Sequence, residues 1–349
     1  MTAALEPTMR AAVIDGPGQL SVRMLDRPEP GPREVVVRIE YCGICGSDLH
    51  GVLDGWMAPG TVEGHEWSGK VVAVGADVTQ WSVGDAVVGG PPWCGECQWC
   101  KAGRPALCVA DPLRNSTAGH TGGFAQYHLS SAASLHAIPP GLDLRTAALA
   151  EPLAVALHGI TAAKLPADPA GLRLLVSGGG PLGLLVAAAL RAFGADDVTV
   201  SEPSPARRKQ AAAVGATAVL APEELPAVPD LPMEAHQDGF HTVIETSGQG
   251  SAVATCIGLL RPTGTLVLLG TGAMTVRMDA IRILLNELVV TGAYCYDDGG
   301  IDAALGLLAS GRLPIDALLS PTDIGLDDLL DTMNRLRAGE IPTKALVRP

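Results

Sequence analysis

The stretch LRLLVSGGGPLGLLVAAAL, residues 172–190, carries the signals of a strand, a tight turn and a helix in direct succession. Gly178, Gly180 and Gly183 form the pattern G-x-G-x-x-G between the strand and the apolar stripe Leu182–Leu190 of the helix. Glycines at these points let the chain turn tightly and let its backbone approach a pyrophosphate, which the N–H groups at the helix start then hold. The stretch therefore predicts a dinucleotide-binding site.

The residues that follow this turn predict which dinucleotide binds. Glu202 ends the next predicted strand, about 20 residues on, where a carboxylate accepts hydrogen bonds from the ribose of NAD and repels the 2′-phosphate of NADP. Arg207 and Arg208 leave NADP open, because arginine near this position can hold that phosphate. NAD is the expected cofactor and NADP the less favoured one. The predicted cofactor contacts are Gly178, Gly180, Pro181, Leu182, Gly183, Glu202, Arg207, Thr246, Leu269 and Thr271.

The rhythm of apolar runs on either side of this stretch predicts the domain organisation. From Leu172 to about Thr291, five apolar strands alternate with helices, which implies a buried parallel sheet. From Val35 to about Ser131, short β-branched runs between Gly, Pro and Asp indicate a mostly β domain. We predict an α/β protein with a mostly β domain over 1–153, a doubly wound domain over 154–294, and a segment over 295–349 that returns to the first domain.

Cys94, Cys97, Cys100 and Cys108 are spaced C-x2-C-x2-C-x7-C, which suits four thiolates around one tetrahedral zinc. Four thiolates close the coordination shell, so this metal is expected to be structural. An iron–sulfur cluster is the competing interpretation, because C-x2-C-x2-C also opens ferredoxin motifs. Here the fourth cysteine comes after seven residues and no proline follows it, which favours zinc.

Cys45, His65, Glu66 and Glu151 form a second candidate metal set. Taken singly, a cysteine is often a small core residue, and a glutamate at a helix start often answers the helix dipole. Taken together, they match a catalytic zinc with three protein ligands and one open position.

Five motifs in this order resemble those of the medium-chain, zinc-dependent alcohol dehydrogenase superfamily, and specifically its sorbitol, threonine and butanediol dehydrogenase branch. They are CGICGSDLH at 42–50, the G-H-E-x-x-G run over 64–78, the four-cysteine loop, AEPLAVALHG at 150–159 and GGGPLG at 178–183. The resemblance covers essentially the whole chain. It implies a GroES-like catalytic domain, a Rossmann domain, and an active site in the cleft between them.

The resemblance also implies a reaction and its site residues. Zinc acts as a Lewis acid on a secondary alcohol, polyol or amino alcohol, and the zinc-bound alkoxide passes a hydride to NAD. Ser47 and His50 are the expected proton relay, although His50 also fits an ordinary surface histidine. Candidates for the substrate pocket, by family position only, are Trp56, Met57, Trp93, Leu113 and Tyr294.

The branch offers two glutamates to the catalytic zinc. The Cys45 thiolate, a neutral His65 and one carboxylate balance the charge of Zn²⁺, whereas a second bound carboxylate would weaken its Lewis acidity. We therefore predict Glu151 as the third resting ligand, with water in the fourth position and Glu66 close by in a catalytic role. Glu66 as the ligand remains the alternative.

Composition excludes several partners. The net charge is −13, from 24 Lys+Arg and 37 Asp+Glu, with no basic run that could follow a nucleic acid. The longest apolar stretch, 174–190, is interrupted by the run Gly178–Pro181, which argues against a membrane span, and no secretory signal is visible. We expect a cytoplasmic enzyme of small alcohols or ketones, and the resemblance suggests a homotetramer or homodimer. A zinc-free quinone or enoyl reductase and a non-catalytic redox sensor are the alternatives; the intact metal ligands argue against both.

The two cysteine-containing sets predict two zinc ions per chain. Metal analysis of the purified protein should find them, and one metal per chain, or iron with sulfide, would contradict the assignment. Cys97→Ser should lower the stability of the fold, because a structural zinc contributes to folding directly. Cys45→Ala should abolish turnover and leave the fold largely intact.

Overall fold

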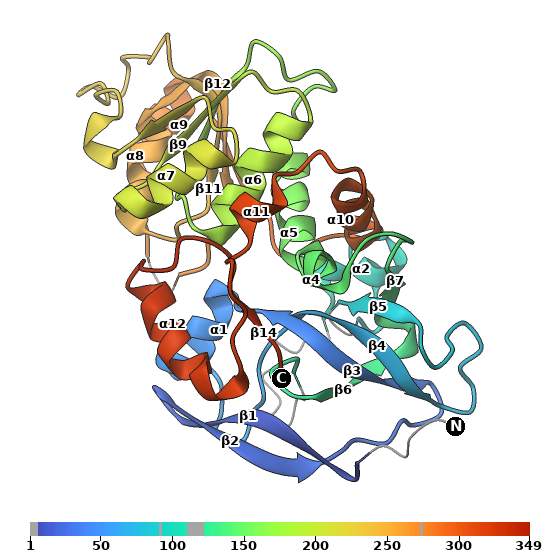
Figure 1. Cartoon of the computed structure of the whole chain (residues 1–349). Helices are drawn as coiled ribbons and strands as arrows, with labels where there is room; N and C mark the ends of the chain where they lie inside the picture. The colour runs from blue at the N-terminus through green and yellow to red at the C-terminus, as the bar shows by residue number, and fades with distance from the viewer. Residues whose placement is uncertain (1–5, 91–92, 110–121, 273–274) are drawn as a thin grey trace. The chain divides into compact units, whose positions relative to one another are not determined.

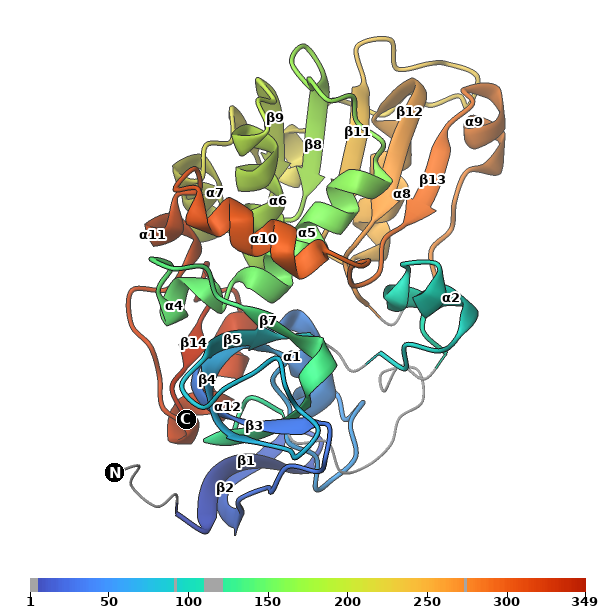
Figure 2. The same cartoon turned by 90° about the vertical axis from the view of Figure 1, so that its right-hand side faces the viewer.

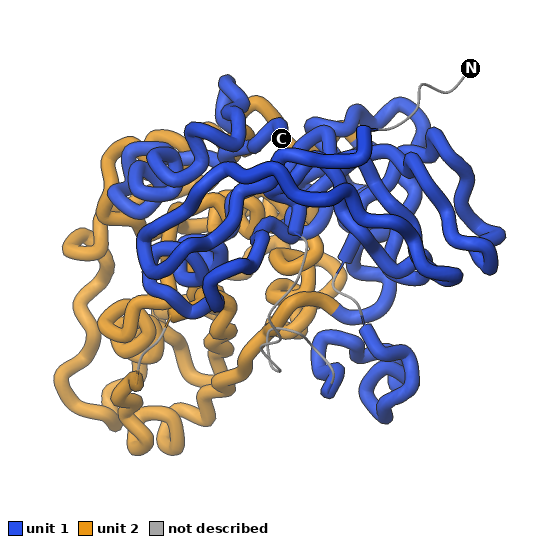
Figure 3. Tube along the Cα trace, turned by 90° about the horizontal axis from the view of Figure 1, so that it is seen from below, with its two compact units in different colours: residues 1–152, 297–310, 320–349 blue, residues 153–296, 311–319 orange. Residues whose placement is uncertain are grey.

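The computed structural model describes residues 6–90, 93–109, 122–272 and 275–349 (Figure 1). The chain forms two compact units, coloured separately in Figure 3. Unit 1 contains residues 1–152, 297–310 and 320–349, and unit 2 contains residues 153–296 and 311–319. Among the described residues, no helix is long and apolar enough to cross a membrane.

Unit 1 is built on antiparallel strands. The strands β14, β3, β4, β5 and β7 pair in that order, β6 pairs with β3, and β1 and β2 form a separate hairpin. The strands are β1 (Thr8–Gly16), β2 (Gln19–Asp26), β3 (Glu34–Gly43), β4 (Glu66–Val74), β5 (Ala86–Gly89), β6 (Tyr127–Ser131), β7 (Leu135–Ala137) and β14 (Leu346–Val347). The helical segments are α1 (Gly46–Leu53), α2 (Gln98–Lys101), η1 (Pro105–Leu107), η2 (Ala132–Ser134), α4 (Leu144–Ala147), α10 (Gly300–Ala309), η4 (Leu326–Asp328) and α12 (Leu329–Arg337).

The core of unit 1 lies where these strands turn their apolar side chains inward. Val35, Val37 and Ile39 alternate along β3 and are buried together with Trp67 of β4 and Phe124. Val36 lies between them on the opposite face and is buried as well, so both faces of this part of β3 are covered. Near the C-terminus, β14 pairs with the end of β3, Leu346 opposite Gly43, so the last residues of the chain join the same sheet.

Unit 2 is built on a parallel sheet with the strand order β10-β9-β8-β11-β12-β13, and Figure 2 shows its strands side by side. The strands are β8 (Arg173–Ser177), β9 (Asp197–Ser201), β10 (Ala218–Leu220), β11 (Phe240–Glu245), β12 (Leu260–Leu268) and β13 (Val289–Gly292). The helical segments are α5 (Ala150–Ala162), which begins in unit 1, α6 (Pro181–Ala192), α7 (Pro205–Ala213), η3 (Pro222–Glu224), α8 (Gly250–Gly258), α9 (Ala280–Leu285) and α11 (Ile315–Leu318). The order reverses between β8 and β11, as in a doubly wound nucleotide-binding fold. The predicted α/β fold class is confirmed.

Two parts of the fold escaped the sequence analysis. The parallel sheet has six strands rather than the expected five, because β10 is only three residues long and half-buried and gives a weak apolar signal. The hairpin of β1 and β2 lies before Val35, where the mostly β pattern was expected to begin. The burial of β2 is mixed along its length, so its periodicity is indistinct.

The glycine turn after β8 gives a test of the fold. A side-chain carbon at Gly183 would lie 2.0 Å from the carbonyl oxygen of Gly178, whereas one at Gly180 meets nothing within 4 Å. Gly183→Ser should therefore destabilise the protein by about 1–3 kcal/mol, because neither backbone segment can withdraw easily. Gly180→Ser, at the N-cap of α6, should stay within about 0.5 kcal/mol of wild type, because serine is favoured there. Urea unfolding measures both, and equal losses would contradict the argument.

Candidate active site and metal centres

The four-cysteine loop of unit 1 brings its sulfur atoms together. The sulfurs of Cys94, Cys97, Cys100 and Cys108 all lie within 4.8 Å of one another, and none of them is in a disulfide. The short helix α2 begins just after Cys97 and contains Cys100, and η1 ends just before Cys108. This compact set of four sulfurs fits one tetrahedral metal ion.

Backbone N–H groups favour the thiolate form of two of these cysteines. The pKa of Cys97 is lowered to about 6, first by the backbone N–H of Cys100, and that of Cys94 is lowered by the N–H of Cys97. Burial raises the pKa of Cys100 to about 12. Zinc binds the thiolate form of cysteine. Cys94 and Cys97 already favour that form, whereas Cys100 must lose its thiol proton before it can bind zinc.

The second group in unit 1 consists of Cys45, His65 and Glu66, whose ligand atoms also lie within 4.8 Å of one another. Cys45 is the N-cap of α1, and His65 and Glu66 stand at the start of β4. One carboxylate oxygen of Glu66, Oε2, is buried and has no hydrogen-bond partner among the described residues. A buried anionic oxygen left unpaired beside a thiol and an imidazole matches the donor set of a catalytic zinc.

Gly43 makes room for Glu66. The two residues are opposite each other in the β3–β4 ladder, and a side-chain carbon at Gly43 would lie 2.2 Å from Glu66 Oε2. The other oxygen, Oε1, accepts a hydrogen bond of 2.6 Å from Lys344 Nζ, which also donates to the carbonyl oxygen of Ile44 at 3.1 Å. Both charged side chains are buried. Lys344, just before β14, was missed by the sequence analysis because it lies 278 residues from Glu66.

Glu151, at the start of α5, is not in the close group with Cys45 and His65 but belongs to the same buried cluster of charges. Burial raises its pKa to about 7; the charge of Glu66 adds to this effect, and His65 and Lys344 oppose it. A carboxyl in such a balance changes its proton state easily when a cation arrives. The choice of Glu151 over Glu66 as the zinc ligand stays a prediction.

Asp48 is a further site residue that the sequence analysis did not single out. It is fully buried in α1; its Oδ2 accepts the N–H of Cys45 at 2.7 Å, and its Oδ1 lies 3.5 Å from His65 Nδ1. Burial alone lowers the pKa of His65, but the charges of Asp48 and Cys45 outweigh it and raise that pKa well above its usual value. With Nδ1 turned to a carboxylate, Nε2 is the nitrogen left for a metal. The spacing C-x-x-D at a helix start was the available signal.

The predicted relay residues both lie on α1. Ser47 is half-buried in its first turn, and His50 stands one turn later. His50 Nδ1 lies 2.6 Å from Asp54 Oδ2, and its ring stacks on Trp56 with centroids 4.5 Å apart and an interplanar angle of 14°. Trp56, a candidate for the substrate pocket, is therefore also a neighbour of the predicted relay histidine.

The structure gives fewer contacts for the other candidates for the substrate pocket. Met57 packs against the core of unit 1, Trp93 and Tyr294 are half-buried, and Leu113 lies outside the described residues.

In unit 2, the turn after β8 has the form expected of a nucleotide site. Gly178 has φ +105°, a conformation that favours glycine, and Pro181 opens α6. Glu202 is buried after β9; its Oε2 accepts the N–H of Gly179 at 2.8 Å and its Oε1 that of Ser204 at 2.9 Å. The carboxylate thus stands beside the glycine turn, where an adenosine ribose is expected.

The two arginines after Glu202 differ in their contacts. Arg208 Nη1 donates to the carbonyl oxygens of Glu202 and Pro203, at 2.9 and 2.7 Å. The backbone N–H of Arg207 donates to Ser204 Oγ, the N-cap of α7, at 3.5 Å. Arg208 is therefore occupied as a brace of the turn.

The other predicted cofactor contacts lie at the ends of β11 and β12. Thr246 Oγ1 is 3.0 Å from the Ser177 carbonyl oxygen and 3.1 Å from that of Gly178, so it braces the glycine turn. Leu269 is buried and Thr271 is exposed. Glu245, which was not predicted, is buried before Thr246 and accepts the N–H groups of Ser247 and Gly248, fixing the loop after β11.

Comparison with known proteins identifies the family. Residues 31–140 match the alcohol dehydrogenase GroES-like domain, and residues 181–310 match the zinc-binding dehydrogenase domain. The chain is 34% identical to a probable D-xylulose reductase A of Arthroderma otae over 352 residues, which covers 97% of both chains. It belongs to the zinc-dependent medium-chain alcohol dehydrogenases.

Two further comparisons agree with this family. The chain is 31% identical to sorbitol dehydrogenase of Bacillus subtilis, covering 96% of this chain and 95% of the relative. A zinc-binding dehydrogenase structure from Sinorhizobium meliloti 1021, bound to NADP, superposes with a TM-score of 0.84 at 33% identity, over 99% of this chain and 100% of the other. The resemblance found in the sequence is confirmed, as is an enzyme acting on CH–OH groups with a nicotinamide cofactor. Zinc or NAD(P) contacts of individual residues remain predictions.

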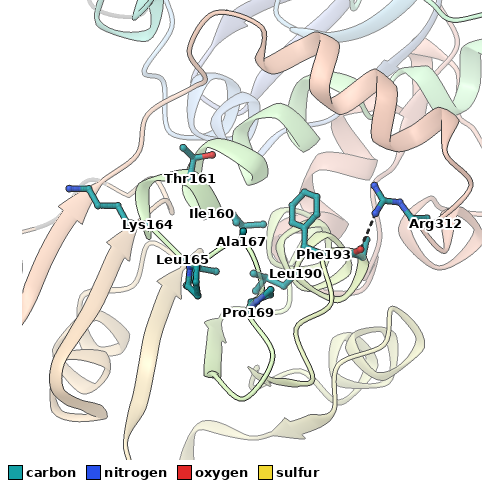
Figure 4. A pocket seen from close by; sticks show the side chains of 11 residues that line it. Ile160, Thr161, Lys164, Leu165, Ala167, Pro169, Leu190, Phe193 and Arg312 are labelled. Atoms are coloured by element: carbon teal, nitrogen blue, oxygen red, sulfur yellow. Dashed lines mark hydrogen bonds between the residues drawn. The ribbon is translucent and has the colours of Figure 1, made fainter.

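A separate cavity of about 440 Å³ lies in unit 2 of the dehydrogenase (Figure 4). Most of its lining residues are apolar, Leu165, Leu190 and Phe193 among them, but Thr161, Lys164 and Arg312 also line it. Arg312 at its edge donates to the carbonyl oxygen of Ala192 at 3.1 Å. None of the predicted site residues lines this cavity.

The contribution of the buried Lys344–Glu66 pair to the stability of unit 1 can be tested by mutation. In protein stripped of metal, Lys344→Met should destabilise the fold by about 3–5 kcal/mol, because it leaves the Glu66 carboxylate buried without a cation. Adding Glu66→Gln should recover part of that loss. Lys70→Met, an exposed lysine on β4, is the control and should change stability by less than about 0.5 kcal/mol. Urea unfolding after chelation measures all three, and equal stability of Lys344→Met and wild type would contradict the argument.

Proposed function

We propose that this dehydrogenase oxidises a secondary alcohol, polyol or amino alcohol to the carbonyl compound, with NAD as the hydride acceptor. The observation that carries the proposal is the group of Cys45, His65 and Glu66, with one buried carboxylate oxygen of Glu66 unpaired. A zinc with three protein ligands keeps its fourth position open for substrate, whereas a structural zinc has four protein ligands. The four-cysteine loop is proposed to hold a second, structural zinc.

The protein's own residues divide the chemistry among themselves. Zinc, when bound, supplies a Lewis acid that lowers the pKa of the substrate hydroxyl. Cys45 and His65 are proposed to hold it, with Glu151 or Glu66 as the third ligand, and Asp48 keeps the His65 ring in its orientation. Ser47 accepts a hydrogen bond from the substrate hydroxyl and passes its proton toward His50, which releases it to solvent. NAD, when bound, would supply the hydride acceptor, so each turnover would also yield one proton for this relay to remove.

Unit 2 is proposed to bind the cofactor and unit 1 to hold the reacting groups. The glycine turn, the free space above Gly180 and the carboxylate of Glu202 support the pyrophosphate and ribose contacts. Thr246, Leu269 and Thr271 are proposed to complete the site. NAD is preferred over NADP in this proposal because Glu202 is an anion and Arg208 is occupied by backbone oxygens.

We further propose that the enzyme is a homotetramer or homodimer. Ile281, Leu284 and Leu285 of α9 and Val289 of β13 expose half or more of their apolar surface. Among the described residues β13 pairs only with β12, so it is an edge strand of the parallel sheet whose outer backbone groups could pair with another chain. Exposed apolar side chains beside an unpaired edge support association through this face. A cytoplasmic location stays a prediction.

The direct test is a panel of sugars, polyols, diols and amino alcohols offered with NAD and with NADP while reduced nicotinamide is monitored. Turnover should require zinc, be lost on chelation, and show a higher kcat/KM with NAD. Glu202→Gln, which removes the charge and keeps the shape, should shrink that preference by about tenfold, or about 1.4 kcal/mol. A wild-type preference for NADP would refute the role given to Glu202, and no turnover with any alcohol would refute the function.

A further inference from the structure

His50 is held on two sides by residues outside the expected relay. Its Nδ1 lies 2.6 Å from Oδ2 of Asp54, the C-cap of α1, four residues on. Trp56 stacks on the ring face at 4.5 Å, nearly parallel to it. The imidazole is 26% exposed, so it still reaches solvent.

Asp54 is fixed in turn from α12. Arg337 Nη1 donates to Asp54 Oδ1 at 2.7 Å and Nη2 to Oδ2 at 2.9 Å, a two-pronged contact, and Nη2 also reaches the carbonyl oxygen of Leu49 at 3.2 Å. The hydrogen bonds from Arg337 and then from His50 lower the pKa of Asp54. All of these residues belong to unit 1.

This arrangement determines which nitrogen of His50 carries the proton. An ionised carboxylate only accepts hydrogen bonds, so a contact of 2.6 Å requires Nδ1–H as the donor. The neutral ring then presents its Nε2 lone pair, the form that a proton acceptor must have. The opposite tautomer would set a lone pair against the carboxylate and leave no acceptor at Nε2.

We propose that Asp54 is a positioning residue of the proton relay, which holds His50 in the Nδ1–H tautomer while Arg337 holds Asp54. This role rests on the function proposed above, in which His50 takes the alcohol proton. In the step itself, Nε2 accepts the proton while Nδ1–H stays bonded to Asp54, and the resulting imidazolium then gives the Nε2 proton to water. The ring returns to its starting tautomer, and one proton has moved from the relay to solvent.

The simpler explanation is that Asp54 only ties α1 to α12 through Arg337. Exposed ion pairs of this kind contribute little to stability, about 0–1 kcal/mol. The two explanations differ in what the loss of Asp54 does to His50, which a direct observation of the ring can detect without turnover.

The first measurement is the ¹⁵N NMR spectrum of the histidine side chains of the whole enzyme, with the His50 signals assigned by their absence in His50→Gln. The neutral His50 of wild type should be protonated at Nδ1. Asp54→Ala should yield a mixture of tautomers, and Asp54→Asn, whose Oδ1 still accepts a hydrogen bond, should retain Nδ1–H. Asp327→Ala, which removes a similar two-pronged pair with Arg10, is the control and should leave the His50 spectrum unchanged. Protonation at Nε2 in wild type, or an unchanged spectrum in Asp54→Ala, would overturn the proposal.

The second measurement is steady-state alcohol oxidation by the same variants. Asp54→Ala should lower kcat about tenfold with little change in KM, less than the loss of a sole general base because water can replace the relay. His50→Gln should lower it at least as far, because a mixture of tautomers keeps some of the competent form, and the double variant should show no loss beyond that of His50→Gln. Additive losses would overturn the proposal, because Asp54 would then act on something other than His50.

Two outcomes separate this proposal from its alternatives. Arg337→Gln removes the ion pair between α1 and α12 but leaves the contact of Asp54 with His50, so it should cost less activity than Asp54→Ala. If both variants lost equal activity and the tautomer of His50 were unchanged, the proposal would be overturned and the ion pair alone would explain the loss. Wild-type turnover in His50→Gln would refute the relay of the proposed function, and with it any role of Asp54 in turnover. An unchanged His50 NMR spectrum in Asp54→Ala would refute the positioning role without any measurement of turnover.

Discussion

The buried ion pair between Glu66 and Lys344 is the interaction on which the group of Cys45, His65 and Glu66 in unit 1 depends. A carboxylate deep in an apolar sheet is costly unless a cation meets it, and Lys344 Nζ does so at 2.6 Å. The pair also joins β4 to the residues that precede β14, so the last strand of the chain is locked beside the site. One oxygen of Glu66 is anchored to the fold in this way, while the other has no hydrogen-bond partner among the described residues.

Further charged side chains surround this pair. Asp48 orients His65, and Glu151 is buried within reach of both His65 and Lys344. The carboxyl groups here outnumber the cationic side chains, so the local charge favours the binding of a divalent cation. The cysteine loop uses a different device: backbone N–H groups directed at sulfur stabilise thiolates near the protein surface, without a buried counter-charge.

Unit 2 depends on a constraint of space instead of charge. The turn after β8 keeps its shape because Gly183 packs against the carbonyl of Gly178 and Thr246 braces the same backbone from β11. Glu202 closes the turn from β9. Three neighbouring strands thus contribute to one turn at the point where the strand order reverses, which is where open parallel sheets bind nucleotides.

The sequence by itself determined the fold class, the glycine turn and the family, and it singled out two sets of candidate metal ligands. The glycine turn and the cysteine loop depend on local spacing: the three motif glycines lie within six residues and the four cysteines within fifteen. The sequence did not reveal β10, whose three residues give too short a pattern. Only the tertiary structure brought Lys344 to Glu66, 278 residues away, and Arg337 to Asp54, 283 residues away. Contacts of that range leave no period or motif in the chain, since they are set by how strands and helices far apart in sequence pack together.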